Sequence, residues 1–104
     1  MVNSKGPKVR GSGGSSLEVE RVQTGVRMEK RILKVLKALA ELHDLSLGDL
    51  LEGIVLHAFD GKAPFSAKTL GQVAELKRIY GLDLDAAASH NLRESGRRAR
   101  GRPG

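Results

Sequence analysis

Three histidines and two aspartates are the side chains of this sequence that could support metal binding or catalysis. His43 and His57 fall near the ends of two predicted helices and His90 comes much later, a spacing unlike that of metal-binding motifs. The sequence has no cysteine, which excludes thiolate ligands and disulfides. Asp83 and Asp85 lack an accompanying nucleophile, paired base or glycine-rich phosphate loop. We therefore expect a protein that is not an enzyme and has no metal site or cofactor.

Basic residues are concentrated at both ends of the chain. Residues 1–16 and 95–104 contain no acid. Their cations are Lys5, Lys8, Arg10, Arg97, Arg98, Arg100 and Arg102. The net charge of +6 comes mainly from these two stretches, because basic and acidic residues nearly balance between them. This distribution favours contact with a polyanion.

The central part of the chain is also divided by charge. Residues 21–37 oppose a single acid, Glu29, with six cations: Arg21, Arg27, Lys30, Arg31, Lys34 and Lys37. Residues 38–61 contain acids and no Lys or Arg. These acids are Glu41, Asp44, Asp49, Glu52 and Asp60. The pattern predicts one positive and one negative end of the domain, the first suited to a polyanion.

A short stretch near the start of the basic segment has the alternation of a β-strand. Val22, Thr24, Val26 and Met28 alternate with Gln23, Gly25 and Arg27. No other convincing strand follows, and unpaired backbone groups of a lone strand are costly. Pairing with the same strand of a second chain satisfies them. The pattern therefore predicts a homodimer.

The rest of the central region has helical periodicity. Ile32, Val35, Leu36, Leu39 and Leu42 form one apolar stripe. Ser46 is a predicted N-cap for a second helix from about Leu47, ended by Asp60-Gly61. Its predicted buried residues are Leu50, Leu51, Ile54, Val55, Ala58 and Phe59. Ser66 and Gly81 bound a third helix, and residues 83–92 are a candidate fourth helical segment.

Strand, helix, turn and helix in this order resemble the ribbon-helix-helix (Arc/MetJ-type) family of DNA-binding proteins. The resemblance covers residues 20–61 and rests on the stretches 22–28, 29–40 and 45–51. It implies a mainly α fold in which one short strand and two helices form an intertwined homodimer. Three positions differ from the usual pattern: Gly25 is in mid-strand, Glu29 stands where proline often starts the first helix, and Asp44 occupies the turn position of Gly or Asn.

The resemblance implies that the paired strands enter the major groove of double-stranded DNA. On the outer face Gln23 and Arg27 would contact base edges, with Gly25 between them and Arg21 flanking. Gln pairs bidentately with adenine and Arg with guanine, each good contact discriminating by about 1–3 kcal/mol.

The resemblance also assigns phosphate contacts and a dimer core. The amides of Ser46, Leu47 and Gly48 at the start of the second helix would bind phosphate, together with Lys30. The dimer core would comprise Val22, Val26, Met28, Leu36, Leu50 and Ile54.

Four regions follow from these patterns. Residues 1–17 form a flexible basic arm, 18–61 the ribbon-helix-helix domain, 62–94 a C-terminal helical extension, and 95–104 a disordered Arg/Gly-rich tail. Lys5, Lys8, Arg10, Arg100 and Arg102 of the arm and tail would add DNA contacts. Residues 100–103 resemble the core of an AT-hook, which binds the minor groove, although a generic basic tail has the same composition.

The predicted function is that of a sequence-specific transcriptional regulator, a repressor, that binds DNA as a dimer or a pair of dimers. Two alternatives stay open: an antitoxin that binds its toxin through residues 62–94, and a DNA-architectural or plasmid-processing accessory protein. The sequence contains neither a signal peptide nor a run of about 20 apolar residues, so we expect a cytoplasmic, nucleoid-associated protein without membrane contact.

Overall fold

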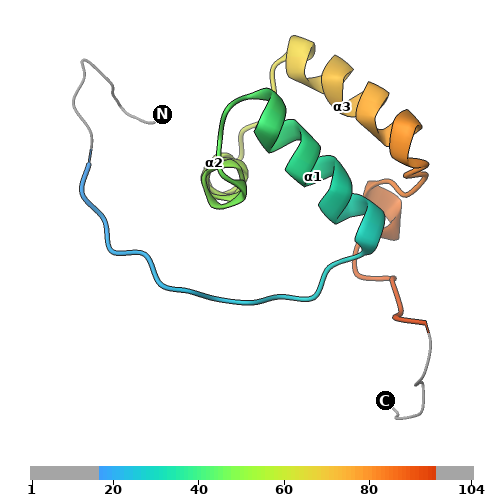
Figure 1. The fold of residues 1–104 in the computed structure, drawn as a ribbon, viewed down its shortest axis with the longest axis horizontal. Coiled ribbons are helices and arrows are strands. Elements are labelled where there is room, and N and C mark those ends of the chain that lie inside the picture. The colour runs from blue at the N-terminus through green and yellow to red at the C-terminus, as the bar shows by residue number, and fades with distance from the viewer. Residues whose placement is uncertain (1–16, 96–104) are drawn as a thin grey trace.

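The computed structural model describes residues 17–95, which contain three α-helices and one short 3₁₀ turn (Figure 1). Helix α1 spans Lys30–Leu42, α2 spans Leu47–Phe59 and α3 spans Ala67–Tyr80. The three predicted helices are therefore confirmed. The candidate fourth segment is reduced to the 3₁₀ turn η1, Ala86–Ala88. No helix within residues 17–95 has the length and apolar character needed to cross a bilayer.

Local capping explains where the helices begin. Ser46 Oγ accepts a hydrogen bond from the Asp49 amide at 3.1 Å, and Ser66 Oγ does the same for Thr69. Helix α1 begins differently, because the carboxylate of Glu29 accepts the amides of Arg31 and Ile32, both at 2.9 Å. Glu29, one of the three positions that differ from the ribbon-helix-helix pattern, is thus the N-cap of α1.

All three helices end in the same geometry. Asp44, Gly61 and Gly81 have φ values of 57°, 70° and 67°, in the left-handed region. The residue after each of them donates its amide back to the helix; Leu45, for example, bonds to the Ala40 carbonyl at 2.9 Å. Asp at position 44 tolerates this conformation better than most residues because its side chain is short and polar.

Helix α1 is the centre of the fold. It packs against both α2 and α3, running antiparallel to α3 in Figure 1. Leu39, Ala40 and Leu50 form the buried cluster. The partly buried side chains around it are Leu36, Ile54, Phe65, Val73 and Leu76. Val73 and Leu76 show that α3 belongs to this core.

The predicted β-strand is wrong. Residues 17–29 form an extended segment without strand pairing, and no strand occurs among the described residues, so there is no β-ribbon (Figure 1). The side chains of Val22 and Val26 are 76% and 74% exposed. The alternating pattern indicates which side chains share a side of an extended backbone, but a strand also needs a neighbour for its amides, and residues 17–95 supply none. The ribbon-helix-helix fold is thereby contradicted, while its mainly α character holds.

Candidate nucleic-acid interface

A stripe of lysines runs along the exposed side of α1. Lys30, Lys34 and Lys37 occupy positions i, i+4 and i+7, and all three are exposed. None forms an ion pair with a carboxylate of residues 17–95. The Lys34 ammonium lies 5.9 Å from the centroid of the Tyr80 ring on α3. We refer to these three residues as the lysine stripe.

The lysine stripe begins at the helix end where cations are least favourable. The N-terminus of an α-helix carries partial positive charge, which disfavours lysine there and attracts anions. The first turn of α1 contains no acid, but Glu29 caps it and pairs with Arg31, which also contacts Asp83. Lys30 is therefore the cation in this turn that has no carboxylate partner among residues 17–95.

Arg21 is exposed, but its guanidinium is paired with acids of α2 and is not free for DNA. Its guanidinium forms a two-point contact with Glu52 of α2, at 2.8 Å from Nε and 2.7 Å from Nη2. Nη2 also donates to Asp49 at 3.1 Å. These contacts raise the pKa of Arg21, and the hydrogen bond from Arg21 lowers the pKa of Glu52. The predicted separation of positive and negative ends is therefore wrong at this point, because the acidic helix folds back onto the basic segment.

Arg27 is also paired, with an acid from the far end of the described chain. Its guanidinium contacts both carboxylate oxygens of Glu94, and the Nε–Oε1 distance is 3.1 Å. The hydrogen bond with Glu94 raises the pKa of Arg27. Gln23 remains exposed, and a Cβ atom added to Gly25 would meet no atom within 4 Å. Of the predicted base-contacting residues, Gln23 is thus exposed without a charged partner, whereas Arg21 and Arg27 are held by carboxylates.

Arg31 stabilises the contact between α1 and α3. It pairs with Glu29 and with Asp83, and its Nη1 also donates to the Gly81 carbonyl at 3.0 Å. The pKa of Glu29 is lowered because its carboxylate accepts the Ile32 amide and pairs with Arg31. These contacts join the start of α1 to the end of α3.

The predicted phosphate site at the start of α2 is separated from Lys30. Lys30 begins α1, whereas Ser46, Leu47 and Gly48 follow its other end, about 20 Å away along a 13-residue helix. Asp49 in the first turn of α2 adds negative charge beside these amides. A Cβ on Gly48 would contact only Ser46 Oγ, at 4.0 Å, so a side chain would fit there.

The predicted dimer-core residues divide into two groups. Leu50 is buried, and Leu36 and Ile54 pack against the core of the single chain, whereas Val22 and Val26 are exposed. Met28 is 37% exposed. On α2, Val55, Ala58 and Phe59 were predicted to be buried but are exposed. The predicted terminal contacts at Lys5, Lys8, Arg10, Arg100 and Arg102 lie outside the described residues.

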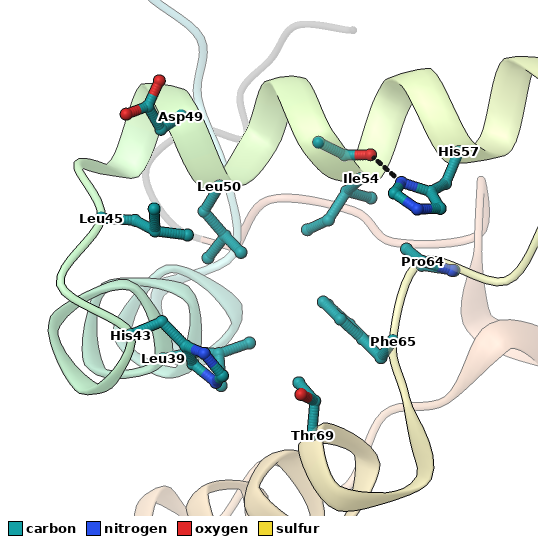
Figure 2. A pocket seen from close by; sticks show the side chains of 11 residues that line it. Leu39, His43, Leu45, Asp49, Leu50, Ile54, His57, Pro64, Phe65 and Thr69 are labelled. Carbon is teal, nitrogen blue, oxygen red and sulfur yellow. Dashed lines mark hydrogen bonds between the residues drawn. The ribbon is translucent and has the colours of Figure 1, made fainter. Parts of the chain in front are cut away.

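A small apolar cavity of about 200 Å³ lies between α1, α2 and the segment that leads into α3 (Figure 2). Leu39, Leu50, Ile54 and Phe65 contribute its apolar lining. His43 and His57 line it as well but bond within the chain: His43 Nε2 lies 2.8 Å from Gln72 Oε1, and His57 Nδ1 lies 2.7 Å from the Gly53 carbonyl. Among the described residues no group of three or more His, Cys, Asp or Glu side chains could hold a metal ion.

Sequence reasoning missed the acids that hold the arginines. Asp49, Glu52 and Glu94 lie 28, 31 and 67 positions from their partners. The only available signal was the presence of opposite charges in neighbouring segments, which does not identify pairs.

No protein-family model, curated protein or solved structure matches this chain. The resemblance of residues 20–61 to ribbon-helix-helix proteins therefore stands on the sequence pattern alone, and its β-ribbon is absent from the described residues.

Proposed function

We propose that this protein is a non-enzymatic, DNA-binding transcriptional regulator, a repressor, that contacts the phosphate backbone of double-stranded DNA through the lysine stripe. The observation that carries the proposal is that Lys30, Lys34 and Lys37 are exposed, aligned and without carboxylate partners among the described residues. The arrangement is unfavourable for α1 itself but favourable for a bound anion. Sequence preference would come from Gln23, and from Arg27 when it leaves Glu94.

In this proposal the protein acts as a homodimer whose two copies contact each other through the exposed side of α2. Leu51, Val55 and Phe59 are spaced at i, i+4 and i+8, so they form one stripe on this helix. The Phe59 side chain is 80% exposed, and Leu51 is only partly buried. A helix that is apolar on both its core side and its outer side typically packs against other elements on both sides. A second copy offers the same stripe for symmetric packing.

The dimer is tested by sedimentation of the full chain at about 10 µM. Phe59→Ser should shift the protein to monomer, because it removes the largest exposed apolar side chain of α2. Ile79→Ser on α3, where the side chain is 57% exposed, is the matched control and should leave the dimer intact. A wild-type protein that is already monomeric would contradict this part of the proposal.

DNA binding is tested with two double variants of equal charge. Lys30→Gln/Lys37→Gln removes two members of the lysine stripe, and Lys62→Gln/Lys68→Gln removes two exposed lysines elsewhere. Each phosphate contact contributes about 0.9 to the slope of log K against log salt, so the first variant should flatten the slope by about 3 to 4 for a dimer. The control should change it by less than about 1. Equal effects of both variants would refute the lysine stripe as the contact surface.

A DNA-architectural accessory protein is the second candidate, favoured by the pairing of Arg21 and Arg27 with carboxylates and by the absence of a side chain at Gly25. These three features reduce direct contact with base edges, so contacts with the phosphate backbone would supply most of the binding. Competition with random-sequence duplex separates the candidates, because a repressor prefers its own site by about 10³-fold or more. A preference below about tenfold would favour the architectural role.

A further inference from the structure

We propose that Asp49, Glu52 and Glu94 form an intramolecular carboxylate clamp that occupies Arg21 and Arg27 in the free protein and that DNA phosphates must displace. The inference deepens the proposed function and rests on it. It concerns the regulation of DNA affinity by the protein's own acids.

The geometry at Arg21 is that of an anion site already filled. Glu52 accepts from Nε and Nη2 at 2.8 and 2.7 Å, the two-point arrangement that guanidinium also forms with phosphate. Asp49 adds a third acceptor at 3.1 Å. A phosphate can approach this edge of Arg21 only if the carboxylates leave it.

The same arrangement recurs at the other end of the segment. Both oxygens of Glu94 face Nε and Nη2 of Arg27. Asp49 and Glu52 come from α2, and Glu94 comes from the segment after η1. Two separate parts of the chain therefore hold residues 21–27. Arg31 is different, because its acids Glu29 and Asp83 tie α1 to α3 within the fold.

The clamp is the main attachment of the extended segment. Every residue from 17 to 28 is exposed, and none of them takes part in a described backbone hydrogen bond outside the helices. Arg21, Arg27 and their partners are themselves exposed. Exposed ion pairs are weak and screened by salt, so a polyanion can compete for these arginines.

The clamp also predicts a particular salt dependence. Salt weakens the contact of an arginine with phosphate, but it also weakens the carboxylate pair that the arginine must leave, so the two effects partly cancel. Arg21 and Arg27 therefore contribute little to the salt dependence of DNA binding in the native protein. When the clamp acids of an arginine are neutralised, that arginine should contribute to the salt dependence of DNA binding as an unpaired cation does.

The test compares Glu52→Gln and Glu94→Gln with Glu20→Gln in the full chain, using a random-sequence duplex of about 30 base pairs. Glu20 is exposed, lies beside Arg21 and has no ion pair within the described part of the chain, so its variant changes the net charge equally. The clamp variants should raise affinity about 2- to 5-fold more than the control. Glu94→Gln should also steepen the slope of log K against log salt by about 1, and Glu52→Gln by less than about 1, because Asp49 still accepts from Arg21.

A second arm repeats Glu52→Gln in an Arg21→Ala background, where the gain should disappear if it acts through Arg21. A gain that persists there, or clamp variants that match Glu20→Gln, would overturn the clamp while leaving DNA binding intact. If no form binds the duplex at low salt, the proposed function fails and the clamp as a competitor of DNA fails with it. Trypsin cleavage after Arg21, faster in Glu52→Gln, would then show that the ion pair itself still exists in solution.

Discussion

Leu39 offers the most direct test of how this small domain is held together. Its side chain is 1% exposed and is the largest fully buried one among the described residues. Leu42, one turn further along α1, is 54% exposed. The same substitution at both positions, Leu→Ala, therefore compares a core site with a surface site on one helix.

Leucine-to-alanine substitutions in cores cost about 2.7–5 kcal/mol, the larger values accompanying rigid cavities. Leu39 also lines the open cavity of about 200 Å³, so the vacated space can be reached by water or filled by shifts of Ile54 and Phe65. We therefore expect a loss near the lower end, about 3 kcal/mol. The total stability of a domain of this size is about 4–12 kcal/mol, so the loss would remove a large share of it.

Urea unfolding followed by circular dichroism measures both variants at one protein concentration. Leu39→Ala should lower the midpoint at an unchanged slope, whereas Leu42→Ala should change the free energy of unfolding by less than about 1 kcal/mol. Equal losses at the two positions would refute the placement of the core at the centre of α1.

Two further predictions concern the ends of the helices. The pKa of Glu29 is lowered in the folded state, so its contribution to stability is complete above the ordinary carboxyl pKa and is lost as the pH falls from about 5 toward the lowered value. Glu29→Gln should therefore flatten the loss of stability between pH 6 and pH 3, measured as urea midpoints, and an unchanged pH profile would contradict the capping role. Gly81→Ala should destabilise by about 1 kcal/mol because of its φ of 67°, whereas Gly71→Ala within α3 should stabilise by up to about 1 kcal/mol. Thermal unfolding of the two glycine variants checks the signs, and shifts in the same direction would show that one backbone assignment is wrong.

The helices could be predicted from the sequence because their boundaries are set by neighbouring residues. Ser46, Ser66 and Gly81 act within four positions of the groups that they cap, so a local pattern identifies them. The 83–92 segment was overestimated, since only Ala86–Ala88 has helical geometry. Its alanines favour a helix but offer few apolar side chains to hold one against the core.

The strand and the charge distribution could not be obtained in this way, because both depend on partners distant in sequence. The alternation from Val22 to Met28 fixes which side chains share a side of an extended backbone, but not whether another strand is available. The contact of Arg21 with Glu52 requires α2 to fold back toward the segment before α1. Counting charges along the chain placed these two residues at opposite ends of the domain.

The central position of α1 has a consequence for how signals could pass through the molecule. Within residues 17–95, α2 and α3 each pack on α1 and not on one another. Besides the segment that joins them, α1 is therefore the element through which α2 and α3 are connected, and it is the helix that carries the lysines. A shift of α1 caused by contact at either outer helix would therefore also move Lys30, Lys34 and Lys37.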